Sequence, residues 1–498
     1  MLFWLAACTR QWEGSATWAP PAENYIAAPQ TTPTPTVFAT PTHPADQPWP
    51  TPTPDAPHTL PPLRAQETHY VIQSGDTLAI LARRFQVSVE AIAKANHLSN
   101  INILSVGQPL VIPAPQPAAT APAFKILPDS ELVASPSNAT FDLRAFIARQ
   151  PGFIRTYRET VEGEDLDAAA IIARVAGNYS VNPRLLLSLL EYQSHWLSQA
   201  SPPPRAQKYP LGWNDPRREG LWKQLNWAAN ELNRGYYLWR VGGLGAFVLA
   251  DSQLVRAQAT VNAGTAGVQH FFALLDDLPS WQHDVGPQGL AATYRRLFGE
   301  PFAYALEPLL PPNLRQPAMQ LPFEADVPWY FTGGPHGAWG DGSAWGALDF
   351  APSDLPVGAG CQVSASWVTA VADGLVVRSD HGVVILDLDG DGYEQTGWAV
   401  LYLHIADQGR VPTGTFLHTG ERIGHPSCTG GVANATHLHI ARKYNGEWIP
   451  ADSDLPWVLE GWVSEGAGRP YDGYLRRGDQ VREACECRQP KNTLQHGR

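Results

Sequence analysis

The stretch NATHLHIAR, residues 434–442, carries two histidines one residue apart between apolar neighbours. Successive side chains of a β-strand point to opposite faces, so His437 and His439 would project side by side from the same face. Such a pair suits a metal ligand with a neighbouring base. With 15 His in 498 residues, chance alone supplies about 0.4 such pairs, so the rest of the sequence has to decide whether this pair has a function.

Length and composition predict several domains and exclude some classes of function. A chain of 498 residues, 44% of them hydrophobic, can bury more than one core. The net charge is −12 and no block of Lys and Arg stands out, which argues against a nucleic-acid partner. After the first few positions there is no long apolar run, so we expect no membrane-spanning helix.

The first residues resemble an export signal. Leu-Ala-Ala-Cys, residues 5–8, resembles the lipobox of bacterial lipoproteins, where the signal is cut before the Cys and the thiol is acylated. Only seven residues precede Cys8, whereas a complete signal has about 15–30. We therefore interpret residues 1–8 as a truncated lipoprotein signal, with a chance match as the alternative. The resemblance implies an extracytoplasmic protein of the cell envelope, with a lipid anchor at Cys8.

A Pro- and Thr-rich segment, residues 9–66, follows the first cysteine. This composition cannot bury a core and predicts an extended linker. If the protein is exported, Cys361 and Cys428 could form a disulfide. Cys485 and Cys487 lie near the C-terminus, and the four cysteines allow three pairings among which the sequence does not choose.

Residues 67–114 predict a strand, two helices and a second strand. His69–Gln73 alternates and contains β-branched residues, Asp76 or Thr77 can cap a first helix, and Ser88 can cap a second. The motifs SGDTL and VGQPLVIP then complete a close resemblance to the LysM module. This resemblance implies a βααβ fold that binds N-acetylglucosamine-containing chains such as peptidoglycan. Its glycan groove maps onto the residues Gly75, Asp76, Thr77, Leu98, Asn100 and Ile101, with helix capping as the alternative role of Asp76 and Thr77.

A second linker, residues 115–136, precedes a helical domain at residues 137–318. Asn182 and Pro183 open one of its helices, which is apolar nearly all round and therefore buried. The domain is faintly similar to lysozyme-like lytic transglycosylases, whose helix ends in a Glu that acts as the acid. Gln193 stands at that position and cannot donate a proton. We therefore expect a lysozyme-like domain without cleavage, or an unrelated helical bundle.

From about residue 321 to 452, strand-like segments alternate with Gly-rich turns, which predicts a β-rich domain. Four pieces within it follow in order. These are GGPHGAWGDGSAWGALDFAP with His336 and Asp349, the turn ADGLVV, the segment LYLHI with His404, and the opening HLH pair. Together they resemble the lysostaphin-type zinc endopeptidases, which cut peptidoglycan cross-links.

The resemblance implies one zinc ion held by His336, Asp349 and His439, with an open position for water. His437 would act as general base, and His404 would assist proton transfer or stabilise the oxyanion. The family usually spaces its first His three residues ahead of the Asp, whereas twelve residues separate His336 from Asp349 here. A Gly-rich loop can double back to deliver His336. The alternative is that His336 is a surface loop residue and the site is broken.

Two further segments carry weaker signals. Asp387, Asp389 and Asp391 fit the first half of a calcium loop, but Trp398 replaces the Glu expected at its end. An acidic hairpin loop is the alternative. Residues 453–498 predict a C-terminal tail that packs on the preceding domain or is partly free.

The sequence therefore predicts a multidomain α+β protein with a LysM module, a helical domain and an antiparallel β-rich peptidase domain. Its predicted function is that of a cell-wall zinc metalloendopeptidase that hydrolyses peptide bonds of peptidoglycan. One alternative is an inactive peptidase-fold envelope protein that binds peptidoglycan and regulates another hydrolase. A further alternative is glycan cleavage by the helical domain.

Overall fold

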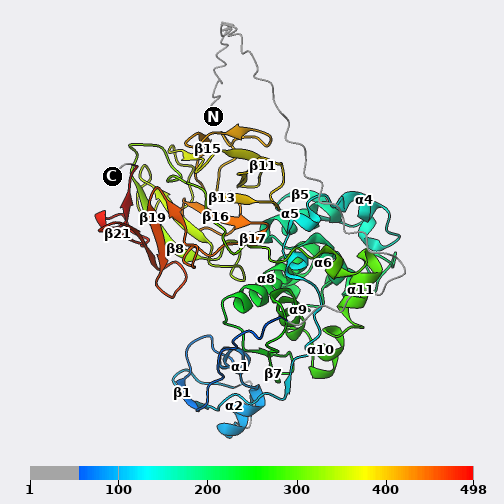
Figure 1. Cartoon of the computed structure of the whole chain (residues 1–498). Coiled ribbons are helices and arrows are strands. Elements are labelled where there is room, and N and C mark those ends of the chain that lie inside the picture. Colours follow the sequence, from blue (N-terminus) through cyan, green and yellow to red (C-terminus); the bar gives the residue numbers. More distant parts are fainter. Residues whose placement is uncertain (1–54, 99, 102, 497–498) are drawn as a thin grey trace, which may run out of the picture. The chain divides into compact units, whose positions relative to one another are not determined.

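The computed structural model describes residues 55–98, 100–101 and 103–496 (Figure 1). Cys8 and most of the predicted N-terminal linker lie outside these residues. In the described residues, no helix combines the length and the apolar character that crossing a membrane requires. The described residues all belong to one compact unit.

The N-terminal unit has the predicted βααβ order. Strand β1 (Thr68–Val71) pairs antiparallel with β2 (Pro109–Ile112), and helices α1 (Leu78–Phe85) and α2 (Val89–Ala95) lie between them in sequence. Ile72, Leu81, Ile92 and Ile112 are buried in its own small core. Thr77 caps α1 by accepting a hydrogen bond from the Ile80 N–H at 3.1 Å, and Ser88 caps α2 by accepting one from the Ala91 N–H at 2.9 Å.

The region that follows is mainly helical. Its longest helix is α8, which buries an apolar face against α9 and α5. Asn182 caps α6 by accepting a hydrogen bond from the Arg184 N–H at 2.9 Å, with Pro183 in its first turn as predicted. The helices are α3 (Asp129–Leu132), α4 (Leu143–Ala148), α5 (Ala168–Tyr179), α6 (Pro183–Ser194), α7 (Pro204–Lys208), α8 (Leu221–Arg240), α9 (Ala263–Ala273), α10 (Leu278–Asp284) and α11 (Leu290–Phe298). Short 3₁₀ turns occur at η1 (Pro136–Asn138), η2 (Phe153–Arg155), η3 (Pro216–Arg218) and η4 (Pro301–Tyr304).

Two small sheets accompany these helices. One joins β3 (Ala119–Thr120), β7 (Leu254–Arg256) and β6 (Ala246–Val248), and the other is the hairpin of β4 (Arg158–Val161) and β5 (Glu164–Asp167). The prediction of an all-α domain is therefore wrong in part, because this region also contains five short strands in two sheets.

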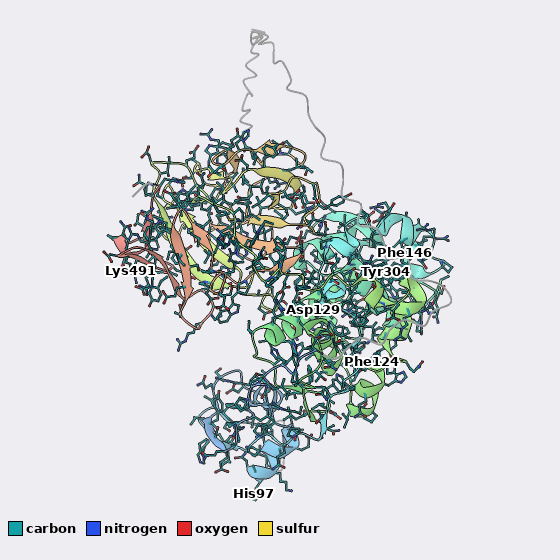
Figure 2. The ribbon with its side chains drawn as sticks, in the orientation of Figure 1. His97, Phe124, Asp129, Phe146, Tyr304 and Lys491 are labelled. Atoms are coloured by element: carbon teal, nitrogen blue, oxygen red, sulfur yellow. A yellow bond between two sulfur atoms is a disulfide. The ribbon has the colours of Figure 1, made fainter. Side chains whose placement is uncertain are left out.

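The segment predicted as a second linker is part of this folded region. Strand β3 pairs in parallel with β7, and Ile126, Leu127 and Leu132 are buried in the main core. Asp129, labelled in Figure 2, accepts hydrogen bonds from the Gly264 N–H at 2.7 Å and from Asn262 at 2.8 Å. The Ala/Pro-rich start of this segment predicted a linker. The apolar residues later in the same segment bury enough surface to become part of the core.

The predicted N-terminal linker also ends in contact with this region. Lys125 pairs with Asp55 at 2.6 Å, and the His58 ring stacks on Trp239 with centroids 4.8 Å apart. Residues 55–61 therefore contact the helical region, and Arg64 donates hydrogen bonds to the carbonyls of Ile112 and Pro113 in the N-terminal unit.

The β-rich domain is built on a nine-stranded antiparallel sheet. Its order is β14-β11-β12-β13-β16-β9-β8-β22, with β17 paired to β16. The strands are β8 (Trp329–His336), β9 (Ala347–Pro352), β11 (Gly374–Asp380), β12 (Val383–Asp387), β13 (Trp398–Leu403), β14 (Phe416–Leu417), β16 (Leu438–Tyr444), β17 (Glu447–Trp448) and β22 (Thr493–Leu494). A separate pair joins β10 (Val368–Thr369) and β15 (Arg422–Gly424).

Both faces of this sheet are buried. Val383 and Ile385 of β12 join the core shared with the helical region, whereas Val384 and Leu386 join the second core on the other face. A strand that is covered on both faces has a continuous run of apolar residues, which explains the sequence VVILD of β12. The helical region is thus packed on one face of the sheet.

Hydrogen bonds cross this contact at its centre. The Ser180 hydroxyl donates to the Gly446 carbonyl at 2.7 Å, and the Trp448 N–H donates to the Tyr237 hydroxyl at 2.9 Å. The Tyr236 hydroxyl donates to Glu447 at 3.1 Å. The turn between β16 and β17 is therefore fixed to α5 and α8.

The segment predicted as a C-terminal tail is folded. Strands β18 (Val458–Leu459), β19 (Trp462–Gly466), β20 (Gly473–Arg477) and β21 (Gln480–Glu483) form a four-stranded antiparallel sheet. After the turn η5 (Pro490–Asn492), β22 pairs with β8 of the main sheet. Lys491, labelled in Figure 2, pairs with Glu483 at 3.0 Å. Buried Trp457, Trp462 and Leu475 explain why this segment folds on the domain.

Replacing Trp448 with Ala should destabilise the helical region and the sheet together. This side chain is fully buried in their shared core, so truncation should cost about 3–5 kcal/mol in free energy of unfolding. Urea denaturation, followed by helix and tryptophan signals, should show one shifted transition. Val432→Ala, at a fully exposed position, is the control and should leave the midpoint unchanged; two separate transitions would contradict the shared core.

Candidate metal centre

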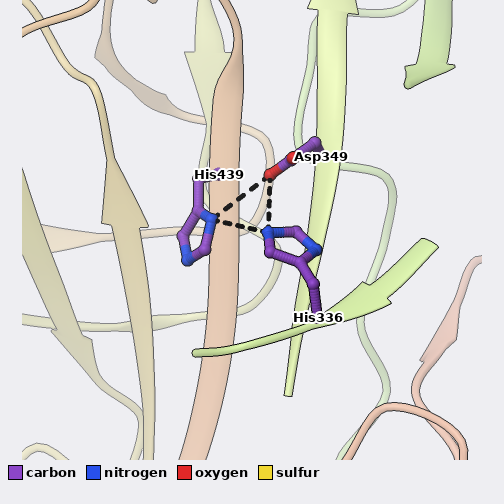
Figure 3. Close-up of side chains that lie close together, drawn as sticks. All are labelled: His336, Asp349 and His439. Carbon is purple, nitrogen blue, oxygen red and sulfur yellow. Dashed lines mark hydrogen bonds and ion pairs between the residues drawn. The ribbon is translucent and has the colours of Figure 1, made fainter. Parts of the chain in front are cut away.

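Three polar side chains from neighbouring strands converge at one end of the main sheet (Figure 3). His439 of β16 lies opposite Asp349 of β9 in register, and Asp349 lies opposite Gly333 of β8, which ends at His336. His336 Nε2 lies 3.0 Å from His439 Nδ1 and 3.3 Å from Asp349 Oδ1, and the last two atoms are 3.2 Å apart. All three residues are buried.

The outer nitrogens of the two histidines are hydrogen-bonded to the backbone. His336 Nδ1 donates to the Gly334 carbonyl at 2.8 Å, and His439 Nε2 donates to the Ala338 carbonyl at 3.0 Å. With the proton on those atoms, each inner nitrogen presents a lone pair. Asp349 Oδ1 is buried and accepts no hydrogen bond among the described residues. Three electron-rich atoms facing one another are a donor set that fits a divalent cation.

The twelve-residue gap between His336 and Asp349 contains the loop of a β-hairpin and the first two residues of β9. Strands β8 and β9 pair antiparallel, and His336 lies opposite Ala347 in the register. A side chain at Gly333 would place its Cβ 2.6 Å from the Asp349 carboxylate, so only glycine allows this approach. His336 is 2% exposed, and the alternative that it is a surface loop residue is therefore wrong.

His404 and His437 lie beside the three metal-ligand candidates. Their ring centroids are 4.5 Å apart, and His437 Nε2 is 3.8 Å from Asp349 Oδ1. His404 Nδ1 donates to the Thr429 carbonyl at 3.2 Å, and His437 Nδ1 donates to the Ala435 carbonyl at 2.8 Å. His404 has a φ of 69°, which is strained for a residue with a Cβ. Strained residues of this kind cluster at functional sites.

Burial and charge set the protonation of the cluster. Burial lowers the pKa of His404 to about 3, and the neighbouring His437 and His439 lower it further in the same direction. Burial also lowers the pKa of His336, but Asp349 outweighs it and the pKa is raised, so a proton competes with a cation for the inner nitrogen of this imidazole. Burial opposes ionisation of Asp349, yet the adjacent imidazoles hold the pKa of its carboxyl well below the usual value. His404 is therefore neutral at neutral pH.

Tyr471 is a site residue that the sequence motifs did not reveal. Its ring stacks on His336 with centroids 4.1 Å apart and planes 22° apart, and its φ is 70°. The Gly334 N–H donates to its carbonyl at 2.7 Å. It comes from the turn between β19 and β20, in the segment predicted as a tail. The only local signal is the turn sequence Pro-Tyr-Asp-Gly, which says nothing of its partner.

The glycan-binding residues predicted in the LysM-like unit have mixed placements. Gly75 has a φ of 92° in the turn before α1, and Thr77 caps that helix. Asp76 accepts hydrogen bonds from the Gln73 N–H and the Tyr70 hydroxyl, both at 2.8 Å, so it braces the turn. Leu98 packs against the small core, whereas Ile101 and Asn100 are exposed. Structural roles for Asp76 and Thr77 are thus present, and a glycan role for this set stays a prediction.

The acidic loop after β12 gathers three carboxylates. Oxygens of Asp387, Asp389 and Asp391 lie within 4.8 Å of one another. Asp387 is buried and accepts hydrogen bonds from the Gly392 N–H at 2.9 Å and the Asp389 N–H at 3.2 Å. Burial raises the pKa of Asp387 to about 7. These backbone contacts account for the loop as an acidic hairpin turn.

The metal-site residues open into a cavity of about 1100 Å³. Loops around residues 355–360 and 430–436 form part of its wall. The disulfide between Cys361 and Cys428 ties these loops together, with Cα atoms 5.5 Å apart, and a second disulfide joins Cys485 to Cys487.

Known proteins resemble separate parts of the chain. The LysM domain family matches residues 70–113, and the family of the LasA N-terminal domain matches residues 125–313. Protease LasA of Pseudomonas aeruginosa is 29% identical over 332 residues, which make up 62% of this chain and 71% of that protein. The N-acetylmuramoyl-L-alanine amidase XlyA of Bacillus subtilis is 42% identical over 60 residues, 12% of this chain and 20% of that one.

Two solved peptidase structures are similar to part of this chain. Pseudoalterin from the deep sea covers 34% of this chain and 96% of its own, with 21% identity and a TM-score of 0.28. The catalytic domain of lysostaphin from Staphylococcus simulans covers 25% of this chain and 90% of its own, with 22% identity and a TM-score of 0.18. The sequence matches show a LysM domain followed by a region of the LasA type.

Removing the first disulfide, by Cys361→Ser with Cys428→Ser, should destabilise the domain. The bond closes 67 residues, and opening a loop of that length costs about 4 kcal/mol in the chain-entropy model. Thermal unfolding of the double variant should show a lower Tm than the oxidised wild type. Wild type treated with reductant should fall to the same Tm, and an unchanged Tm in both samples would contradict the pairing.

Proposed function

We propose that this chain, a metallopeptidase of the LasA type with a LysM module, is a zinc endopeptidase that hydrolyses peptide bonds of peptidoglycan. The observation that carries this proposal is the buried Asp349 oxygen, which faces the lone pairs of His336 and His439 at 3.2–3.3 Å. An uncompensated group of this kind is costly in a protein interior unless a cation binds it. Histidine and carboxylate donors are those that hydrolytic zinc prefers.

Zinc held by such a set acts as a Lewis acid that polarises a carbonyl and makes water a better nucleophile at neutral pH. His336, Asp349 and His439 would hold the ion. His437 would take the proton from the attacking water. Its Nε2 lies 3.8 Å from Asp349 Oδ1, a proposed zinc ligand, and therefore close to where zinc-bound water would lie. The pKa of about 3 makes His404 a poor proton acceptor, which supports His437 as the base. His404, whose ring centroid lies 4.5 Å from that of His437, would then orient His437, and His437 would pass the proton on to the leaving amine.

The LysM module would keep the enzyme on its substrate. Binding to the glycan strand raises the effective concentration of cross-link peptides near the metal site. This arrangement supports an extracytoplasmic location in the cell envelope, and a lipid anchor at Cys8 would add a second attachment. A calcium ion at Asp387, Asp389 and Asp391 is a further proposal, supported by the gathering of their oxygens.

The two alternatives are less well supported. An inactive peptidase fold would lack part of the cluster, but all five polar residues are assembled. Glycan cleavage in the helical region needs an available acid near Gln193. The nearby Glu191 carboxylate accepts hydrogen bonds from the Leu197 and Ser198 N–H groups and pairs with Arg296 at 2.9 Å. Its contacts are those of a structural residue.

Purified wild-type protein should contain one zinc per chain and release new amines from purified sacculi. His439→Ala should lose the zinc and at least about 100-fold of the rate, since even changes next to metal ligands cost 10–100-fold. Metal analysis of the same samples tests the calcium proposal, because calcium would remain in the variant. New reducing ends in place of amines would support glycan cleavage, and a wild type without zinc or activity would support the inactive fold.

The two remaining histidines can be separated by their effects on rate and metal content. His437→Ala should keep its zinc and lower kcat by about 10²–10⁴-fold, the range for removal of a general base. His404→Ala should also keep its zinc and lose less activity, because its pKa makes it a weaker base. His418→Ala, an exposed histidine elsewhere in the domain, is the matched control. A larger loss in His404→Ala than in His437→Ala would reverse the assignment.

A further inference from the structure

A second hollow lies in the helical region, between η3 and the start of α8. It has a volume of about 370 Å³ and is lined by Asp215, Arg217, Arg218, Trp222, Lys223 and Asn226. Trp222 and Asn226 also line the larger cavity that contains the metal-site residues. The two hollows therefore share these two side chains as part of their walls, and both side chains come from α8 of the helical region.

This second hollow has an excess of positive charge. Arg217 is paired with Asp215 at 2.7 Å. No carboxylate in the described part of the chain pairs with Arg218 or Lys223. Two side chains that line the hollow therefore carry unpaired positive charges. The chain as a whole has a net charge of −12, so a local cationic hollow is not a result of overall composition. It would attract an anionic ligand.

Arg174 adds a buried donor where the two hollows meet. Its side chain is 12% exposed, its Nη2 pairs with Glu164 at 2.7 Å, and its guanidinium lies 6.0 Å from the centre of the Trp222 ring. Its Nη1 is buried and has no hydrogen-bond acceptor among the described residues, since Glu162 is 3.9 Å away. A buried N–H without an acceptor costs free energy. Arg174 is among the residues that line the larger cavity, which places its guanidinium beside a ligand bound there.

We propose that Arg174, Arg218, Trp222, Lys223 and Asn226 form a substrate subsite, the α8 subsite, for the carboxylate-bearing stem peptides of peptidoglycan. The proposal rests on the proposed function, because it places one part of a cross-linked peptide here while another reaches the metal site. The two unpaired cations, Arg218 and Lys223, suit peptide carboxylates. The half-buried Trp222 ring offers a flat apolar surface to the peptide, and the Asn226 amide can bond to a peptide group.

The size of the larger cavity supports an extended ligand. Sites for single small molecules have volumes of about 300–1,000 Å³, and the cavity with the metal-site residues already reaches about 1100 Å³. A peptide that extends past Trp222 would continue into the smaller hollow. The helical region would then act in recognition of the substrate, without a catalytic residue of its own.

Binding without cleavage tests this subsite. The full-length chain with His439→Ala is titrated by calorimetry with sugar-free cross-linked stem peptides, which the LysM module has no sugar to recognise. A matched peptide with its carboxylates amidated is the second ligand. We expect the acidic peptide to bind about tenfold more tightly than the amidated one, and the difference to shrink at high salt.

Variants locate the site. Lys223→Glu, at an exposed position, and Arg218→Gln should each weaken binding of the acidic peptide several-fold and leave the amidated peptide unaffected. Arg149→Glu reverses an exposed charge of the same region outside the subsite and should change neither affinity. Equal affinity for the two peptides, or no effect of Lys223→Glu and Arg218→Gln, would overturn the α8 subsite even if the wild type digests sacculi. Wild type that releases no amines, with binding and its charge dependence intact, would instead overturn the hydrolase.

Discussion

The buried carboxylate of Asp349, held between two imidazole lone pairs, is the constraint on which the other features depend. Its oxygen lies within 3.3 Å of two nitrogens whose protons are directed away from it to backbone carbonyls. Such a group is expensive in a folded protein unless a cation neutralises it. The backbone that places these atoms must therefore be rigid, because a shift of one side chain would break the donor set.

The antiparallel sheet supplies this rigidity. Asp349 and His439 face each other across β9 and β16, so a slip of one residue would turn both side chains to the opposite face. Both faces of the sheet are covered, one by the helical region and the other by loops and the C-terminal sheet. A slip would also move apolar residues between two packed cores. The cost of that exchange fixes the register, and the register fixes the metal site.

Local patterns predicted a large part of this arrangement. The spacing of His437 and His439 predicted a strand with both imidazoles on one face, since periodicity is a local property. The structure has this strand as β16 from Leu438, with His437 directly before it, and it has His404 directly after β13. The capping residues Thr77 and Ser88 could also be predicted from the sequence, because a helix cap depends only on the residues of the first turn. Each of these predictions needed only neighbouring residues in the chain.

Contacts between distant segments could not be predicted in the same way. The hairpin loop that delivers His336 has no fixed length in sequence, and Tyr471 reaches the site from a segment 135 residues later, since 471 − 336 = 135. The segment 115–136 had the composition of a linker, and only the core of the helical region shows that its apolar residues are buried there. Pairings of this kind depend on the whole fold.

The helical region lines part of the cavity with the metal-site residues, so it is placed to take part in substrate recognition, while the metal-site residues of the β-rich domain carry the chemistry. Its helix α8 packs on α9 and α5, the hydroxyls of Tyr236 and Tyr237 hold the β16–β17 turn, and Trp222 on the same helix lines the cavity with the metal-site residues. One rigid helix therefore joins the shared core to the wall of the site. A substrate contact at Trp222 would be positioned relative to His439 by packed backbone, with no flexible connection between them. If the proposed α8 subsite binds the peptide, the LysM module would attach the chain to the glycan without having to align the peptide, because the cavity wall would do so.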